Sequence, residues 1–226
     1  MLRLEHAIAW FKNEFGDSIN AAVEDTPFDI DLLAAIAVQE TYEVWGDLYD
    51  RIGVTDLLEL CVGDTIDAPR RKAFPRTKAQ LLGAPNGDRM FDIARASLEA
   101  IGEYFAVYHK IAVANPNKFC HAFGIFQYDL QHFPENAQYF LERRWADFDA
   151  CLALCIGELA SALKSAFGRR KKKKKLSDEE KVFVAIAYNS GRVNFDKGFK
   201  QGYFDGHKYY GEYIRDFMDL ARHVPA

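Results

Sequence analysis

The feature that most limits the fold of this chain is the helical spacing of its apolar side chains. The first segment already shows it, with apolar residues at intervals of three and four: Leu4, Ile8, Phe11 and Phe15. Such spacing places side chains on one face of a helix. Similar patterns cover most of the 226 residues, and the alternation typical of strands is almost absent. The sequence therefore predicts a mainly α protein, with a small hairpin or irregular element only around residues 119–128.

Capping residues divide this pattern into separate predicted helices. Three residues are expected N-caps because their side chains can accept a hydrogen bond from the first turn: Asp29, Thr55 and Asp88. Ser177 and Glu180 have the spacing of a capping box. After the N-terminal helix, the predicted helices cover residues 30–41, 55–62, 90–109, 134–167, 178–189 and 209–222.

The charge of the chain argues against nucleic acid as its main partner. The net charge is -4, whereas nucleic-acid binders usually carry a basic footprint. The exception is the run of seven basic residues from Arg169 to Lys175. This run is either a solvated loop whose first charges follow a helix C-terminus or a patch for an anionic polymer, such as cell-wall acid, lipid headgroups or nucleic acid.

No targeting or membrane segment is predicted. Glu5, His6 and Lys12 interrupt the N-terminal apolar residues, so they form no signal peptide. No uninterrupted run reaches the roughly 18 apolar residues that a membrane span needs. The chain is therefore expected to be soluble, with export by another route or as part of a larger protein.

The four cysteines do not form a recognisable metal or disulfide framework. Cys151 and Cys155 are four residues apart on one helix face, where a buried apolar role is favoured over a metal site because no nearby ligands complete a tetrahedral set. A disulfide involving Cys61 or Cys120 stays open. No metal or organic cofactor is expected.

Three short motifs, in chain order, suggest chemistry. LLAAIAVQET ends an apolar helix in Glu40, whose carboxyl is expected to have a raised pKa in apolar surroundings, as a general acid requires. AFGIFQYD combines Gly124 and Gln127 in an aromatic-rich run, and AIAYNSG closes a helix with Tyr188 and Asn189. Taken alone, Glu40 is more typical of an exposed helix end, and the alternative role for Tyr188 is that of a core aromatic residue with a satisfied hydroxyl.

Together the motifs resemble the lysozyme-like superfamily, especially goose-type lysozymes and soluble lytic transglycosylases. Those families have a catalytic Glu in an ES pair, a GLMQ element and an AYNAG helix end. The resemblance implies that Glu40 is the catalytic acid, that Gly124 lets backbone approach the sugar chain, and that Gln127 faces the acid across a cleft. It also implies that Tyr188 and Asn189 bind the acid or the substrate.

The chain also departs from the family pattern. Thr41 replaces the usual Ser and Phe126 replaces Met, and about eighty residues separate Glu40 from the second motif. The sequence therefore predicts a lysozyme-like single domain with a subdomain inserted at about residues 42–118. Within this insertion, residues 63–88 are rich in Pro, Gly and charge and are expected to form a surface excursion.

Aromatic residues follow Glu40 at helical spacing. Tyr42, Trp45 and Tyr49 are three and four residues apart, which favours a core face over a wall on which sugars stack.

Asp129 decides between two mechanisms of glycoside cleavage. Goose-type lysozymes have an Asp two residues after the Gln, thought to help position a water for hydrolysis, and Asp129 matches it. Lytic transglycosylases use a single Glu and close a 1,6-anhydro ring. Asp129 favours hydrolysis slightly, although it could equally cap the next turn or pair with His132. Further carboxylates without motif support are Glu43, Asp47, Asp64 and Asp67.

The sequence thus predicts a muramidase that hydrolyses the β-1,4 bond between N-acetylmuramic acid and N-acetylglucosamine. Its expected catalytic residues are Glu40 and Asp129, and its partner is peptidoglycan or a related N-acetylhexosamine polymer. The alternatives are a lytic transglycosylase and a non-catalytic glycan-binding module. Either enzyme would act on the cell envelope, in phage lysis, as a secreted effector or in wall remodelling.

Overall fold

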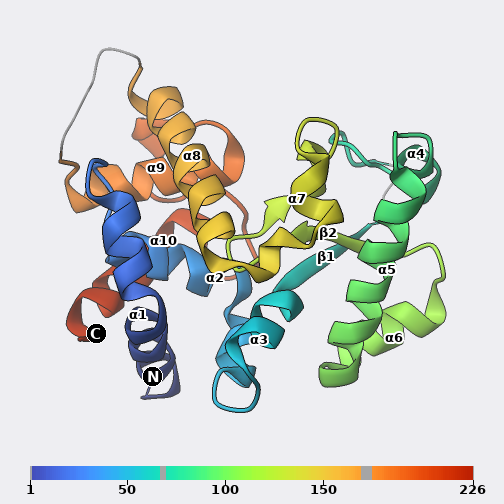
Figure 1. Cartoon of the computed structure of the whole chain (residues 1–226). Coiled ribbons are helices and arrows are strands. Elements are labelled where there is room, and N and C mark those ends of the chain that lie inside the picture. The colour runs from blue at the N-terminus through green and yellow to red at the C-terminus, as the bar shows by residue number, and fades with distance from the viewer. Residues whose placement is uncertain (1, 67–69, 169–174, 226) are drawn as a thin grey trace. The chain divides into compact units, whose positions relative to one another are not determined.

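The computed structural model describes residues 2–66, 70–168 and 175–225, and it is mainly helical with one small sheet (Figure 1). The chain divides into two compact units. Unit 1 comprises Met1–Tyr42 and Leu152–Ala226, and unit 2 comprises Glu43–Cys151. The boundaries fall within α2 (Ile30–Leu48) and α8 (Phe148–Phe167).

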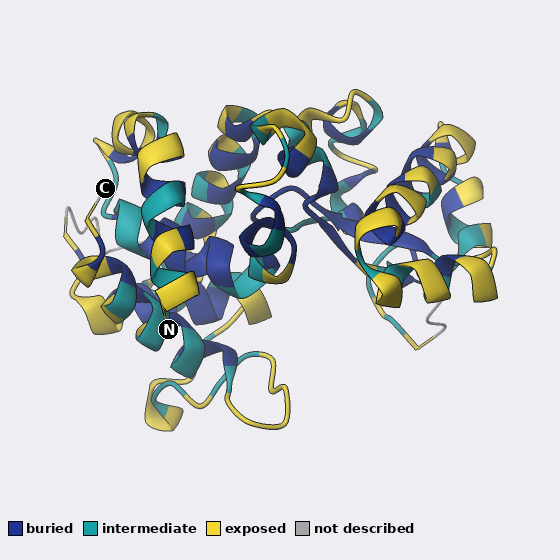
Figure 2. Ribbon diagram, turned by 90° about the horizontal axis from the view of Figure 1, so that it is seen from below, coloured by how far each residue is buried: buried dark blue, intermediate teal, exposed yellow. Residues whose placement is uncertain are grey.

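Unit 1 is built from helices. Besides parts of α2 and α8, it contains α1 (Leu2–Val23), α9 (Asp178–Ser190), η3 (Phe195–Lys197) and α10 (Tyr210–His223). Helix α10 packs against α9 and α1. Residues 32–38 of α2 are all buried, and buried residues, dark blue in Figure 2, run through the helices of this unit. Since α2 is apolar on all sides here, it forms the centre of unit 1.

Lys12 ties three helices of unit 1 together. Its side chain is only 6% exposed and its Nζ lies 2.7 Å from Asp31 Oδ1. It also donates hydrogen bonds to the carbonyl oxygens of Ala221 (2.6 Å) and Val224 (2.9 Å), at the end of α10. Carbonyls in the last turn of a helix lack the full set of intrahelical donors, so Lys12 caps the end of α10.

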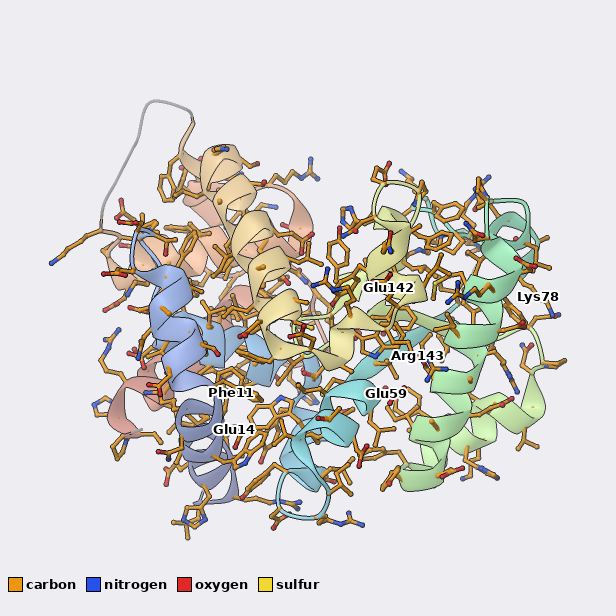
Figure 3. All side chains as sticks on the ribbon, viewed as in Figure 1. Phe11, Glu14, Glu59, Lys78, Glu142 and Arg143 are labelled. Carbon is orange, nitrogen blue, oxygen red and sulfur yellow. The ribbon has the colours of Figure 1, made fainter. Side chains whose placement is uncertain are left out.

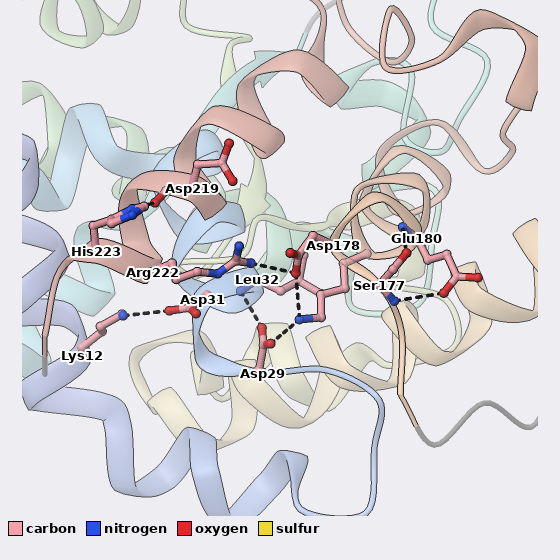
Figure 4. Close-up of polar contacts among 11 residues, drawn as sticks. Lys12, Asp29, Asp31, Leu32, Ser177, Asp178, Glu180, Asp219, Arg222 and His223 are labelled. Carbon is pink, nitrogen blue, oxygen red and sulfur yellow. Dashed lines mark hydrogen bonds and ion pairs between the residues drawn. The ribbon is translucent and has the colours of Figure 1, made fainter.

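A second ionic group in unit 1 surrounds the start of α9 (Figure 4). Asp178 lies 2.7 Å from Arg222 and 3.5 Å from Lys181, and Lys181 also pairs with Asp29. Asp29 Oδ1 in turn accepts a hydrogen bond from Leu32 N at 3.1 Å. The ends of α2, α9 and α10 are therefore joined by charge.

Unit 2 combines a three-stranded sheet with helices. Its elements are α3 (Val54–Leu60), β1 (Val62–Ile66), α4 (Lys78–Leu82), α5 (Gly87–Tyr104), α6 (Ala106–Ala114), β2 (Phe119–Phe123), β3 (Tyr128–Asp129), η1 (Leu130–His132), α7 (Ala137–Leu141) and η2 (Arg144–Ala146). The strand order is β1-β2-β3, antiparallel, with Val62 opposite Phe123 and Phe123 opposite Tyr128. Helix α5 packs on β1 and β2.

Aromatic side chains fill the core of unit 2. The ring of Phe123 lies 4.7 Å from that of Trp145 and 5.6 Å from that of Phe140. At the surface, Arg143 and Glu59 form an ion pair of 2.6 Å (Figure 3). Because both side chains are largely exposed, we expect this pair to contribute at most about 1 kcal/mol.

Several predictions about the fold are confirmed. The protein is mainly α. Asp29 caps α2, and the capping box of Ser177 and Glu180 begins α9. The predicted hairpin is present as β2 and β3. Of the three aromatic residues expected to form a core face, Trp45 is fully buried, whereas Tyr42 and Tyr49 are half-buried.

Other predicted boundaries are wrong. Helix α2 continues to Leu48, and α3 has Gly53 rather than Thr55 at its N-cap. Asn86, not Asp88, is the N-cap of α5. Strand β1 was missed because it lies at the edge of the Pro- and Gly-rich segment that was expected to be a surface excursion, and it gains its pairing only from β2.

Two long predicted helices are each interrupted in the structure. The predicted helix 90–109 is interrupted at Phe105, which is extended, so that α6 turns back onto α5. Gly102 permits this close crossing, since a Cβ there would lie 3.1 Å from the backbone of His109. The predicted helix 134–167 is interrupted at Arg143, whose φ is 52°, and Asp147 begins α8 by accepting a hydrogen bond from Asp149 N at 3.0 Å.

Helix α8 is long and apolar enough, by length and composition alone, to cross a membrane, and it is the only such helix in the described ranges. Core helices of soluble proteins have the same properties. The absence of a membrane span therefore stays a prediction. The same holds for the single domain with an insertion at about 42–118, although unit 2 begins at Glu43 and continues to Cys151.

Two other predictions concern the basic run and the cysteines. Residues 169–174 of the basic run and Asp67 lie outside the described residues. All four cysteines are buried thiols, so the buried position expected for Cys151 and Cys155 is confirmed, although Cys151 Sγ also donates a hydrogen bond to the carbonyl of Trp145 at 3.1 Å. Among the residues that the structure describes, no group of His, Cys, Asp and Glu could hold a metal ion.

Candidate functional site

Glu40 lies within α2, immediately after its buried stretch. The sequence suggested that Glu40 ends its helix. This prediction is wrong, because α2 continues for two more turns, to Leu48. Tyr210, which is 2% exposed, donates a hydrogen bond from its hydroxyl to Glu40 Oε1 at 2.8 Å. The next residue, Thr41, bonds back along the helix to the carbonyl of Ala37 at 3.3 Å. Glu40 is thus held by a buried phenol at the first turn of α10.

Tyr188 belongs to the same group of side chains. Burial, and then the neighbouring Cys155, Glu158 and Glu40, hold the pKa of its hydroxyl well above the usual value. The pKa of Tyr210 is also well above the usual value, first because the residue is buried and second because of the charge of Glu40. Both phenols therefore stay protonated around neutral pH and remain donors to a carboxylate.

Asn189 fixes the segment that leads from α9 to α10. Its Oδ1 accepts a hydrogen bond from Tyr203 N at 3.2 Å. Gly202, in the same segment, packs against Asn189 and Tyr210 and has a φ of 83°. A Cβ at this position would be 2.6 Å from Tyr210 Cβ and 3.0 Å from Asn189 Oδ1. The predicted helix end is confirmed, with Gly191 as the left-handed C-cap of α9.

In unit 2, Gly124 and Gln127 form the turn of the β2–β3 hairpin. Both have positive φ, 84° and 55°, and Gln127 donates to the carbonyl of Gly124 from its backbone N and from Nε2, at 2.9 Å each. A Cβ at Gly124 would lie 2.6 Å from Cys151 Sγ. Ile125 and Phe126 are buried, as predicted for the apolar pair. The conformation and packing of the turn thus account for Gly124 and Gln127 without reference to a substrate.

Asp129 is held by other residues through both of its carboxylate oxygens. Arg71 Nη2 donates to Oδ1 at 2.6 Å and to Oδ2 at 2.8 Å, Gln131 N donates to Oδ1 at 2.7 Å, and His121 Nδ1 lies 3.1 Å from Oδ2. Burial by itself would raise the pKa of Asp129, but the hydrogen bonds from His121 and Arg71 outweigh it and the pKa lies below its usual value.

The two structural roles predicted for Asp129 have different outcomes. The turn-capping role is confirmed, since Asp129 is the N-cap of η1. Pairing with His132 is wrong: the imidazole ring of His132 stacks on Tyr128 at 4.7 Å, and the histidine that pairs with Asp129 is His121 on β2. Of the further carboxylates, Asp64 is 80% exposed and lies 3.6 Å from His121 Nε2.

The chain matches no protein-family model, no curated protein and no solved structure.

Sequence reasoning missed Tyr210, His121 and Arg71. None of these three residues lies in the three short motifs, and each meets its partner across at least 8 residues of sequence. The only available signal for Tyr210 was an aromatic residue at the start of the last helix.

The predicted site residues fall into two groups. Unit 1 brings Glu40 and Tyr188 together with Tyr210, and it places Asn189 on the segment beside them. Unit 2 brings Gly124 and Gln127 into one turn, which leads directly into Asp129. That both groups line a single cleft stays a prediction.

Proposed function

We propose that this chain cleaves the glycan strand of peptidoglycan or a related N-acetylhexosamine polymer, with Glu40 as general acid. The observation that carries the proposal is the hydrogen bond of 2.8 Å from the buried Tyr210 hydroxyl to Glu40 Oε1. A carboxyl group that follows a fully buried helical stretch and is oriented by a fixed donor suits a group that delivers a proton to one atom. The three motifs in chain order supply the substrate class.

In this proposal Glu40 gives its proton to the oxygen of the β-1,4 bond between N-acetylmuramic acid and N-acetylglucosamine. The bond between that oxygen and the sugar carbon then breaks, and positive charge develops at the ring. Tyr210 stabilises the carboxylate that Glu40 has become, because its raised pKa keeps it a donor. No cofactor or metal takes part in this step.

The contacts of Asp129 favour a second candidate for the step after bond cleavage. In hydrolysis, which the sequence favoured slightly, Asp129 would hold the attacking water. Its two oxygens already accept hydrogen bonds from Arg71 and Gln131, and its Oδ2 also faces His121. This supports a lytic transglycosylase, in which Glu40, now a carboxylate, takes the proton of the sugar's own hydroxyl as that oxygen attacks the ring carbon, and a 1,6-anhydro ring closes without a second carboxylate.

Two measurements test this function. Mass spectrometry of the products from defined peptidoglycan distinguishes the mechanisms, since anhydro products are each lighter by one water than hydrolytic products. Glu40→Gln, which keeps the shape of the side chain, is expected to lower the rate by about 10³ or more. A rate near that of the wild type would remove Glu40 from the mechanism.

The remaining alternative is a non-catalytic module that binds glycan. Turbidity of a cell-wall suspension tests it, because an enzyme clears the suspension and a binding module does not. The place of action that accompanies the proposal is the cell envelope. If the basic run from Arg169 to Lys175 binds anionic wall polymer, replacing it by Ser and Gly will weaken binding to intact walls, most at low salt.

A further inference from the structure

The segment before α10 forms a small hairpin that presents two aromatic side chains to solvent. Phe204 and Tyr209 pair as an isolated antiparallel bridge, and their rings lie 4.7 Å apart. Tyr203 is 69% exposed and Phe204 is 48% exposed. Of the aromatic residues that the structure describes as exposed, Tyr203 has the largest exposed fraction, and it lies next to the candidate site.

The hairpin is held by its backbone and by Asp205. Asp205 Oδ1 accepts hydrogen bonds from His207 N (2.7 Å) and Lys208 N (2.9 Å), and its Oδ2 accepts one from the Tyr213 hydroxyl at 2.7 Å. These bonds, led by the one from Lys208, lower the pKa of Asp205 to about 2. Gly206, with φ of 100°, makes the turn. The backbone that carries Tyr203 and Phe204 is therefore held by hydrogen bonds on both sides of the turn.

This hairpin adjoins the group around Glu40. The carbonyl of Tyr203 accepts a hydrogen bond of 2.8 Å from Tyr210 N, and Tyr210 is the residue whose hydroxyl binds Glu40. On its other side, Tyr203 N donates to Asn189 Oδ1 at 3.2 Å. A single backbone residue thus links the exposed ring to two residues of the candidate site.

Asn189 offers a hydrogen-bond donor at the same place. Because its Oδ1 accepts from Tyr203 N, its Nδ2 group points away from that bond. Asn189 is exposed, and no residue in the described part of the chain accepts a hydrogen bond from Nδ2. An aromatic ring beside a free amide donor matches a sugar, which has an apolar face of C–H groups and a polar rim.

We propose that the ring of Tyr203 forms a stacking platform for a sugar ring of an N-acetylhexosamine glycan, with Asn189 as the neighbouring donor. The choice of sugar rests on the proposed function. The size of the surface favours a sugar over a protein partner: at 69% exposure Tyr203 presents on the order of 150 Å². A stable protein interface needs about 800 Å² from each partner.

The platform can be tested with the full chain and the soluble tetramer of β-1,4-linked N-acetylglucosamine. Calorimetric titration is done in the Glu40→Gln background, which prevents turnover. Tyr203→Ala is expected to weaken binding about tenfold, because it removes a stacked ring. Tyr203→Phe keeps the ring and should bind as the parent does. The matched control is Tyr104→Ala, which removes a ring that is 44% exposed on α5.

Tyr203→Ala is expected to fold, since both hydrogen bonds of this residue come from its backbone. Circular dichroism verifies this. Equal binding by the parent and Tyr203→Ala, or no binding by the parent at millimolar tetramer, would overturn the platform. A Tyr203-dependent loss of binding to anionic vesicles, with binding of the tetramer unchanged, would overturn it in favour of a membrane surface.

The outcomes separate the platform from the proposed function. Peptidoglycan cleavage by the wild type, combined with normal tetramer binding by Tyr203→Ala, would refute the platform and leave the function standing. Tetramer binding that depends on Tyr203, without cleavage by the wild type, would support the platform and refute the enzyme.

Discussion

Gly124→Ala tests whether the glycine of the second motif is required by packing. At φ of 84° the residue is in the left-handed region, where a side chain costs roughly 1–2 kcal/mol. A Cβ would also lie 2.6 Å from Cys151 Sγ, 3.2 Å from Tyr139 Oη and 3.3 Å from Trp145 Cβ. Overpacking of a core typically costs about 1–3 kcal/mol. We therefore expect the free energy of unfolding to fall by about 2–5 kcal/mol.

Gly191→Ala is a matched control for this change. Gly191 has φ of 75°, and a Cβ there would meet nothing within 4 Å. This variant should lose only the backbone part, about 1–2 kcal/mol. Urea unfolding, followed by circular dichroism and tryptophan fluorescence, gives both values. The difference between the two variants measures the packing contribution at Gly124.

A double variant makes the test more specific. Cys151→Ala removes the sulfur atom that lies nearest to the new Cβ, so Gly124→Ala should cost less in this background than in the wild type. Equal losses for Gly124→Ala and Gly191→Ala would refute the packing argument. Unchanged stability with lost activity would instead support the prediction that the glycine serves the approach of the sugar chain.

The polar contacts support three further predictions. Lys12→Met leaves Asp31 and two helix carbonyls without their buried partner, and we expect a loss of about 3–5 kcal/mol by urea unfolding, whereas exposed Lys164→Met should change little. The pKa of Asp129 is lowered in the fold, so its contribution to stability is present above its unfolded pKa of about 3.9 and is lost as pH falls through the folded value. In Asp129→Asn the melting temperature should therefore fall less steeply below about pH 4 than it does in the wild type. The same pH dependence of the melting temperature in both proteins would contradict this. Tyr210→Phe should lower glycan cleavage about 10- to 100-fold with the fold intact, because it removes a charge-assisted hydrogen bond to the proposed acid, and full activity would show that this donor is dispensable.

The helices with strong local signals could be predicted from the sequence. The box of Ser177 and Glu180 begins α9, and Gly191 ends it, because caps act on neighbouring backbone groups within a few residues. The β2–β3 hairpin was one of two possibilities predicted for residues 119–128, because this stretch does not follow helical spacing.

Breaks in long helical patterns could not be predicted. Phe105 and Arg143 are ordinary residues in an apolar periodic sequence, and nothing local requires a helix to stop there. Helix α6 leaves the helical path because it packs on α5 at Gly102, and α8 begins at Asp147 after a short turn. The positions where these helices end depend on how helices and strands pack against one another, and the packed residues come from different parts of the chain.

The candidate site shows the same division between local and tertiary information. Glu40 and Asp129 were singled out because their motifs resemble those of the lysozyme-like superfamily. Only the folded chain provides the partners of these carboxylates: Tyr210 is 170 residues from Glu40, and Arg71 is 58 residues from Asp129. The sequence by itself determined which residues carry ionisable groups, because the chemistry of a side chain depends only on the residue at that position. The tertiary structure decided which of those groups are oriented or already engaged, because a hydrogen bond depends on distance in space.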